Sequence, residues 1–200
     1  DDTLVETHAA TIERISHAQG VEHFNWVVMQ KQPGGQERFD KGERVATKEE
    51  IPDGEMLSLE IVNSSVHMGS HVDAPFHYGS TCEGKPARQI MDIPLEWCYG
   101  PGVVLDFTHL KFPDFIDKDK VVAALKKINY KLKPMDIVLF YTGGDKLLGT
   151  DDYVNKYVGL VPSAVEYLLD YGIKMMGIDT IGLDRPCFLM FKEFLTTKDK

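Results

Sequence analysis

The sequence predicts an α/β protein built around a mostly parallel sheet. Its second half alternates short apolar runs with helical patterns, in the order strand, helix, strand, helix, strand. The strand-like runs are Val103–Phe107, Ile137–Tyr141 and Lys174–Ile178. Strands separated by helices pair in parallel, because each helix carries the chain back to the edge where the strand began. At 200 residues the chain suits a single domain, which we expect to comprise residues 1–200.

The first quarter of the chain carries weaker secondary-structure signals. Thr11–Ser16 is compatible with a short helix, whereas Phe24–Met29 has the aromatic and β-branched content of a strand. Gln32–Gln36 contains the Pro-Gly sequence of a turn, and the charge density of Glu37–Glu50 is typical of a solvated surface loop.

A half-buried strand is predicted at Leu57–Asn63, where apolar and polar residues alternate. This strand leads directly into a histidine-rich stretch. Beyond that stretch, Gly79–Arg88 is loop-like, and Trp97–Gly102 contains the Gly-Pro-Gly sequence of a turn before the next strand.

Two helices are predicted between the parallel strands. Asp119–Ile128 places its apolar residues on one face, as expected of a helix with one buried side. Pro162–Tyr171 begins with proline, which is favoured in a first helical turn, and Gly172 follows as its cap. The loop Thr142–Asp145 follows a strand at its carboxyl end, where α/β proteins usually bind ligands.

Composition excludes several classes of protein. The formal net charge of −9 at pH 7 argues against nucleic acid and anionic membranes as partners, because both require a basic surface. No apolar run approaches the roughly 18 residues that span a membrane, and the N-terminus lacks the pattern of a secretion signal. The three cysteines are far apart and odd in number. We therefore expect a reduced, cytoplasmic protein without a disulfide framework.

One histidine-rich stretch predicts a metal site. It holds three of the chain's seven histidines and one aspartate, namely His67, His71, Asp73 and His77. In extended chain, His71 and Asp73 point to the same side, and a turn at Gly69 can bring His67 to join them. Two imidazoles and one carboxylate leave coordination positions open for water and substrate, which distinguishes a catalytic metal site from a structural one.

The residues alone leave alternatives open for this stretch. It could be a polar loop whose side chains hydrogen-bond to the backbone. However, four donor residues at these spacings are less well explained as a chance grouping than as a metal site. His77, which lies across Pro75 from Asp73, could serve as a fourth ligand or as a proton carrier, because histidine titrates near neutral pH.

A family resemblance favours the catalytic interpretation. The string from His67 to His77 resembles the HxGTHxDxPxH signature of the cyclase-like metal-dependent hydrolases, the family of bacterial kynurenine formamidase and isatin hydrolase, with Ser70 in place of the commoner threonine. The resemblance covers about residues 57–186. Its supporting segments are Gly100–Asp106, Leu132–Val138, Thr142–Lys146, Gly149–Thr150 and Gly177–Thr180.

The resemblance implies roles for the four residues. His67, His71 and Asp73 would bind a divalent metal ion, zinc or manganese, and His77 would be the catalytic acid and base. The implied fold is a layered β/β/α domain of the swivelling-domain kind, with a central, mostly parallel sheet and flanking helices.

Family members often carry a later histidine and an acidic or amide residue that complete the coordination or form a second metal site. No histidine follows His109 in this sequence. Either the site is mononuclear and incomplete, or the missing ligands lie beyond Lys200, which is the alternative that we favour.

The implied activity is metal-dependent hydrolysis of a C–N bond in a small molecule. Candidate substrates are an amide, a formamide such as N-formylkynurenine, which would place the enzyme in tryptophan catabolism as an arylformamidase, or a lactam such as isatin. Family members are usually dimers or tetramers, so we expect a homodimer or homotetramer. Two alternatives remain open: a non-haem iron oxygenase, since His-x-Asp is also part of a facial iron triad, and a non-catalytic metal-binding member of the fold.

Other residues are weaker candidates. Asp179, at the end of a predicted strand, could support the site, but a capping or structural role is favoured. Asp145 and Lys146 are more consistent with a solvated pair than with a pocket mouth. Trp26 and Trp97 could contact an aromatic substrate, but core packing is favoured.

Overall fold

The computed structural model describes residues 10–198, which divide into two compact units. Of the described residues, 10–71 form the N-terminal unit and 72–198 form the C-terminal unit. Each unit is described by itself. The expectation of one domain over residues 1–200 stays a prediction.

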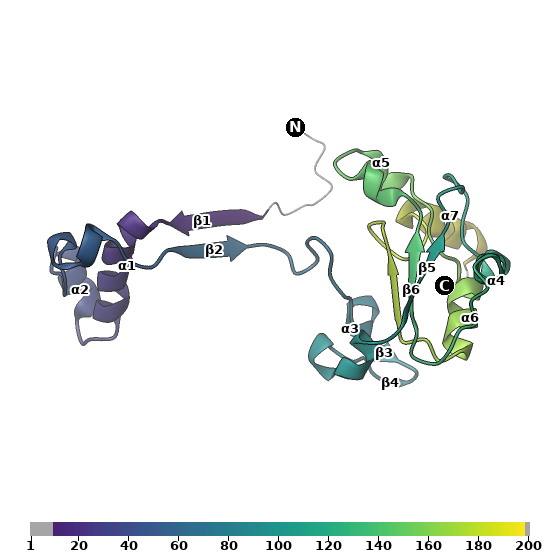
Figure 1. Ribbon diagram of the computed structural model, residues 1–200, viewed down its shortest axis with the longest axis horizontal. Coiled ribbons are helices and arrows are strands. Elements are labelled where there is room, and N and C mark those ends of the chain that lie inside the picture. The colour runs from purple at the N-terminus through teal and green to yellow at the C-terminus, as the bar shows by residue number, and fades with distance from the viewer. Residues whose placement is uncertain (1–9, 199–200) are drawn as a thin grey trace. The chain divides into compact units, whose positions relative to one another are not determined.

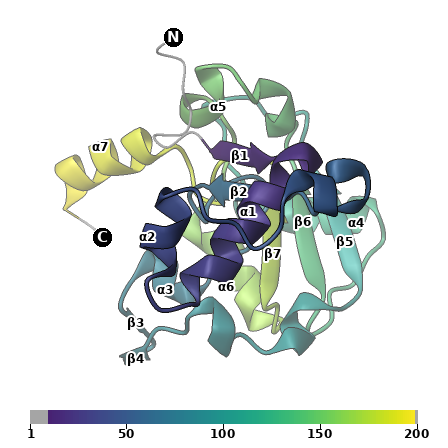
Figure 2. The same cartoon turned by 90° about the vertical axis from the view of Figure 1, so that its left-hand side faces the viewer.

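The N-terminal unit consists of a two-stranded ribbon and two helices (Figure 1). Strand β1 (Thr11–Ile15) pairs antiparallel with β2 (Leu59–Asn63). Helices α1 (His17–Gln30) and α2 (Gly35–Asp40) pack side by side (Figure 2). Two 3₁₀ turns, Lys48–Glu50 and Pro52–Gly54, precede β2.

The predictions for β1 and α1 were wrong, because the helix lies where a strand was expected and the strand where a helix was expected. Within α1, Val21, Asn25 and Met29 are buried. Their spacing of four puts them on one helical face, so packing overrides the β-branched content of this segment. Helix α1 also begins with a capping box, in which the side-chain oxygen of Gln19 accepts from the backbone N–H of Ser16 at 2.9 Å.

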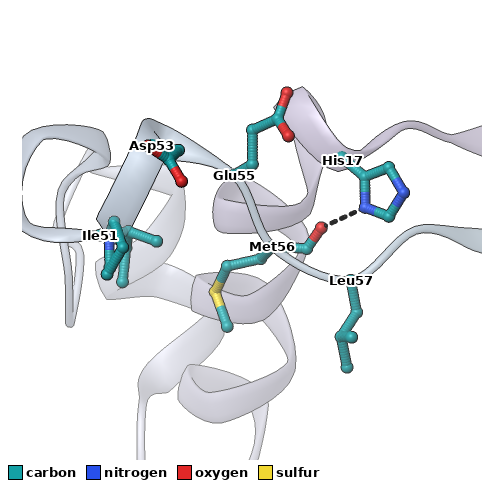
Figure 3. A pocket seen from close by; sticks show the side chains of 7 residues that line it. His17, Ile51, Asp53, Glu55, Met56 and Leu57 are labelled. Atoms are coloured by element: carbon teal, nitrogen blue, oxygen red, sulfur yellow. Dashed lines mark hydrogen bonds between the residues drawn. The ribbon is translucent and has the colours of Figure 1, made fainter.

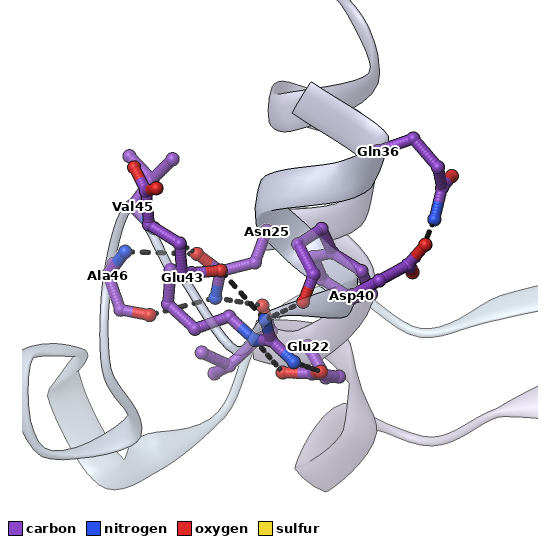
Figure 4. A network of polar contacts seen from close by, with 10 residues as sticks. Glu22, Asn25, Gln36, Asp40, Glu43, Val45 and Ala46 are labelled. Carbon is purple, nitrogen blue, oxygen red and sulfur yellow. Dashed lines mark hydrogen bonds and ion pairs between the residues drawn. The ribbon is translucent and has the colours of Figure 1, made fainter. Parts of the chain in front are cut away.

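Asn25 joins α1 to the loop that follows α2 (Figure 4). Its side-chain amide donates to the carbonyl oxygens of Val21 at 2.9 Å and Ala46 at 2.8 Å. Its oxygen accepts from the backbone N–H groups of Val45 at 2.6 Å and Ala46 at 3.0 Å. Asn25 is 1% exposed, so these bonds satisfy a buried polar side chain and fix the loop against the helix.

The C-terminal unit contains the predicted parallel sheet. Strands β5 (Gly102–Asp106), β6 (Ile137–Tyr141) and β7 (Met175–Ile178) pair in parallel, and β6 lies between the other two (Figure 2). Helices α4 (Lys118–Lys127) and α6 (Pro162–Asp170) lie together on one face of the sheet (Figure 1). These five elements confirm the strand and helix order predicted for the second half of the chain.

The core of this unit lies between the helices and one face of the sheet. The buried side chains alternate along the strands, as they must when one face is covered. On β5, Leu105 is 0% exposed whereas its neighbour Val104 is 56% exposed; on β6, Phe140 is 2% exposed whereas Leu139 is 41% exposed. A parallel sheet with helices is thus observed, and the β/β/α layering stays a prediction.

The remaining elements are short, with one exception. A one-turn helix, α3 (Pro75–Tyr78), is followed by a minimal hairpin of β3 (Thr81–Cys82) and β4 (Lys85–Pro86). Helix α7 (Cys187–Thr197) was not predicted from the sequence. The other short segments are the helix α5 (Asp152–Asn155) and the 3₁₀ turns Ile90–Asp92, Leu95–Cys98 and Gly144–Leu147. None of the helices in residues 10–198 is long and apolar enough to cross a membrane.

Candidate metal centre

The histidine-rich segment is the loop that joins β2 to α3. Gly69 lies in this loop with a φ of +63°, in the left-handed region that glycine adopts without a steric penalty. The predicted turn at Gly69 is therefore present. Residues 71–74 form no helix or strand, and Pro75 occupies the first turn of α3.

The loop brings the three predicted ligands together. One ligand atom from each of His67, His71 and Asp73 lies within 4.8 Å of the other two. Nδ1 of His67 is 3.2 Å from Nε2 of His71. Two nitrogen atoms bound to one ion at about 2.1 Å each lie roughly 3.0–3.4 Å apart, for bond angles between octahedral and tetrahedral values. The distance between the two imidazoles thus fits a shared metal ion.

A backbone contact assigns the tautomer of one imidazole. Nδ1 of His71 lies 2.8 Å from the carbonyl oxygen of Gly69. Because a carbonyl oxygen only accepts, Nδ1 carries the proton and donates it in this bond. Neutral His71 then has a lone pair on Nε2, the atom that faces His67. A hydrogen bond from the second ring nitrogen to a carbonyl is the usual way in which a ligating histidine is oriented.

Asp73 is half-buried and accepts a long hydrogen bond from the hydroxyl of Tyr78, at 3.4 Å. Partial burial raises the pKa of Tyr78, and the charges of Asp73 and Asp184 raise it further, so the phenol stays protonated at neutral pH and can donate. Sequence reasoning did not identify Tyr78. The available signal was its position directly after His77.

His77 lies in α3 and is exposed. Its ring packs edge-on against the ring of Tyr78, with centroids 5.0 Å apart and planes at 79°. His77 does not belong to the group of three donors that the described residues contain. Its role as a proton carrier stays a prediction.

The donor set suits a divalent ion. Neutral imidazole and carboxylate together are ligands of zinc, manganese and iron, and three protein donors leave positions open for water and substrate. Two of these side chains are half-buried and His71 is exposed.

Asp179, the other candidate carboxylate, has a structural role in the C-terminal unit. Its two oxygens accept three hydrogen bonds from the loop after β6, which includes Thr142 and Gly143. The loop at the carboxyl end of β6 is thereby tied to the end of β7. Asp145 and Lys146 in the same loop are both exposed, as expected of a solvated pair.

A hollow of about 520 Å³ lies in the N-terminal unit (Figure 3). Its lining residues are His17, Ile51, Pro52, Asp53, Glu55, Met56 and Leu57. Nδ1 of His17 donates to the carbonyl oxygen of Met56 at 2.7 Å. None of the predicted site residues lines this hollow, and its histidine is used in a structural hydrogen bond.

Comparison with known sequences gives one family and a group of related enzymes. A family profile described as "Putative cyclase" matches residues 14–185. The chain is 32% identical over 123 residues to kynurenine formamidase of Geobacillus thermodenitrificans (strain NG80-2), an alignment that covers 62% of this chain and 51% of the relative. The chain thus spans about half the length of the curated relatives that it matches.

Comparison with solved structures shows a shared fold. An isatin hydrolase bound to the product analogue thioisatinate matches with a TM-score of 0.61 and 20% identity, over 92% of this chain and 62% of that one. Isatin hydrolase A from Labrenzia aggregata, bound to benzyl benzoate, matches with a TM-score of 0.62 and 18% identity, over 93% of this chain and 63% of that one. At these identities the likeness is one of fold.

Proposed function

The chain belongs to the Cyclase family, and from this membership we propose that it is a metal-dependent hydrolase that cleaves a C–N bond in a small amide, formamide or lactam. The observation that carries the proposal is the convergence of His67, His71 and Asp73, whose ligand atoms lie within 4.8 Å of one another. The kynurenine formamidase and isatin hydrolase relatives support the reaction class.

The three converging residues would hold the ion. When bound, a divalent ion lowers the pKa of water to about 7 and polarises a carbonyl group. The Gly69 carbonyl keeps the proton of His71 on Nδ1, so that Nε2 is free of a proton. His77 transfers the proton that the reaction requires. It takes a proton from the attacking water as the C–O bond forms, and it delivers a proton to the nitrogen as the C–N bond breaks.

A formamide is the first substrate to test. The kynurenine formamidase relative is 32% identical to this chain, whereas the two isatin hydrolases match at 20% and 18%. N-formylkynurenine therefore ranks before isatin, and simple lactams follow.

Metal content and turnover, measured together on purified variants, test the proposal. His77→Ala should lower turnover by about 10²–10⁴-fold while metal still binds. His71→Ala and Asp73→Ala should remove metal and activity together. His109→Ala is a matched control, because His109 is exposed and lies outside the donor group. Full metal content and rate in His71→Ala would contradict the proposal.

The identity of the ion requires its own measurement. Imidazole suits zinc, and carboxylate with open positions suits manganese equally well. Elemental analysis of the purified protein, followed by reconstitution with Zn²⁺ or Mn²⁺ alone, identifies the ion that supports turnover. Activity that needs Fe²⁺ and consumes oxygen would instead favour the oxygenase alternative. Stoichiometric metal without turnover on a broad substrate panel would favour the non-catalytic one.

We also propose that the protein is a cytoplasmic homodimer or homotetramer. An isolated two-stranded ribbon is only marginally stable in water, yet the cross-strand pair Ile12 and Val62 is 62% and 60% exposed. A second copy that covers this pair would supply the missing apolar contact. Ile12→Glu should lower the mass measured by light scattering, whereas Thr11→Glu, on the opposite face of β1, should not. An unchanged mass for Ile12→Glu would exclude this face as the interface.

A further inference from the structure

A tyrosine outside the predicted ligand set contacts two of the predicted site residues. The hydroxyl of Tyr78 donates to Oδ2 of Asp73 at 3.4 Å. The ring of the same tyrosine packs edge-on against His77, with centroids 5.0 Å apart. All three residues belong to the short segment that enters and forms α3. One side chain therefore links the proposed ligand carboxylate to the proposed proton carrier.

The conformation of Tyr78 has local causes. The side chain is 67% exposed, so the hydrophobic core does not hold it in place. Pro75 begins the single turn of α3, and Tyr78 is the last residue of that turn. This geometry lets the tyrosine reach back over one turn to Asp73. A substitution at Tyr78 therefore alters the site without opening a cavity in the core.

The two contacts have separate chemical effects. A hydrogen bond to one carboxylate oxygen restricts rotation of the carboxylate and so orients its remaining lone pairs toward a ligand. An edge-to-face contact between rings restricts the orientation of the imidazole. The first effect requires the hydroxyl, and the second requires only the aromatic ring.

We propose that Tyr78 is a positioning residue that orients Asp73 for metal binding through its hydroxyl and His77 for proton transfer through its ring. This inference rests on the proposed function of the same site. Tyr78 itself exchanges no proton and binds no metal. Its effect passes through the two side chains that it contacts.

Two substitutions separate the two effects. Tyr78→Phe removes the hydroxyl and keeps the ring, whereas Tyr78→Leu removes both. Loss of an outer-shell partner typically weakens metal binding by 10–100-fold. Because the hydrogen bond is long, we expect Tyr78→Phe to weaken binding by about tenfold, the low end of that range. The pH profile of turnover in the metal-saturated protein should then match wild type.

Tyr78→Leu should show the same loss of affinity and, in addition, a lower turnover with a changed pH profile. If Tyr78→Phe has the wild-type pH profile and Tyr78→Leu does not, the aromatic ring is the part of Tyr78 that affects the profile. A general loss of structure would not produce this division, because it would change both readouts in both variants.

The experiment is a titration of the full chain with Zn²⁺ or Mn²⁺ against a competing chelator, with circular dichroism to verify the fold. Tyr99→Phe is the matched control, since it also removes a hydroxyl but from a tyrosine that is 90% exposed. Equal affinity in wild type, Tyr99→Phe and Tyr78→Phe would overturn the hydroxyl effect, and an unchanged pH profile in Tyr78→Leu would overturn the ring effect. Both results leave the proposed function intact. Wild-type protein that binds no metal stoichiometrically would instead overturn the proposed function, and this inference with it.

Discussion

Thr142 donates twice to one carboxylate oxygen of Asp179. Its backbone N–H lies 2.9 Å and its hydroxyl 2.7 Å from Oδ1, while the other oxygen accepts from the N–H of Gly143 at 2.7 Å. The end of β7 thereby holds the loop that follows β6. A single carboxylate thus determines the conformation of one loop at the carboxyl edge of the sheet.

Asp179→Asn should therefore destabilise the protein. The amide replaces one acceptor oxygen with an N–H donor, so at least one backbone N–H at Thr142 or Gly143 loses its partner, at a cost of about 1–3 kcal/mol. Urea unfolding measures the change. Asp145→Asn, an exposed carboxylate in the same loop, is the control and should stay within about 0.5 kcal/mol of wild type. Equal stabilities for the two variants would contradict the role assigned to Asp179.

Two adjacent leucines on α6 should respond very differently to truncation. Leu168 is 0% exposed and belongs to the core between helices and sheet, whereas Leu169 is 52% exposed. Leu168→Ala should cost about 2–5 kcal/mol of unfolding free energy, because it removes buried contacts and leaves a cavity. Leu169→Ala should cost less than about 1 kcal/mol. Similar urea midpoints for both would mean that α6 does not pack as described.

The N-cap of α4 should make the folding stability of the protein depend on pH in the acidic range. Oδ1 of Asp117 accepts from the N–H of Lys120 at 2.9 Å, and this bond is the largest cause that lowers the pKa of Asp117. A group with a lowered folded-state pKa contributes its stability above the unfolded value of about 3.9 and loses it as the pH falls through the folded value. Asp117→Ala should thus cost about 1 kcal/mol at pH 7 and less at pH 2.

Asp117→Asn is the control for that experiment. Asparagine caps helices about as well as aspartate but does not titrate. We expect wild-type stability at pH 7 and no contribution from this position to acid unfolding. A penalty for Asp117→Ala that is as large at pH 2 as at pH 7 would show that the charge of the cap has no effect.

Metal should raise the thermal stability of the folded chain. An ion that binds only the folded state at 100 times its dissociation constant adds about 2.7 kcal/mol. Thermal unfolding with and without Zn²⁺ or Mn²⁺ should therefore show a higher Tm for wild type and for His109→Ala. His71→Ala should show no shift. A shift in His71→Ala as large as in wild type would mean that the ion binds elsewhere.

The sheet could be predicted because its strands are continuous apolar runs separated by helical patterns. Ile137–Tyr141 is the clearest case, since its predicted and observed bounds agree. The same reasoning failed at α1. There the residue that decides the structure is Asn25, a polar side chain buried by contacts with the distant residues Val45 and Ala46, and local composition does not reveal such contacts.

The convergence of His67, His71 and Asp73 could be predicted because these residues are close in sequence and separated by a glycine, and their role as metal ligands stays a prediction. Gly69 adopts the left-handed conformation that the turn requires. The contact of Tyr78 with Asp73 could not be predicted, because it depends on the direction in which a one-turn helix leaves the loop. Spacing along the chain does not fix that direction.

The loop that carries the three proposed metal ligands affects the entropy of metal binding. His67, His71 and Asp73 lie within one stretch of seven residues, and the entropy lost on closing a loop grows only with the logarithm of its length. Convergence of these donors therefore costs less conformational entropy than closing a longer loop, by about 0.6 kcal/mol for each doubling of loop length. The three proposed ligands all lie in this short stretch, so we expect core substitutions such as Leu168→Ala to weaken the fold and leave the affinity of the folded molecules for the ion unchanged.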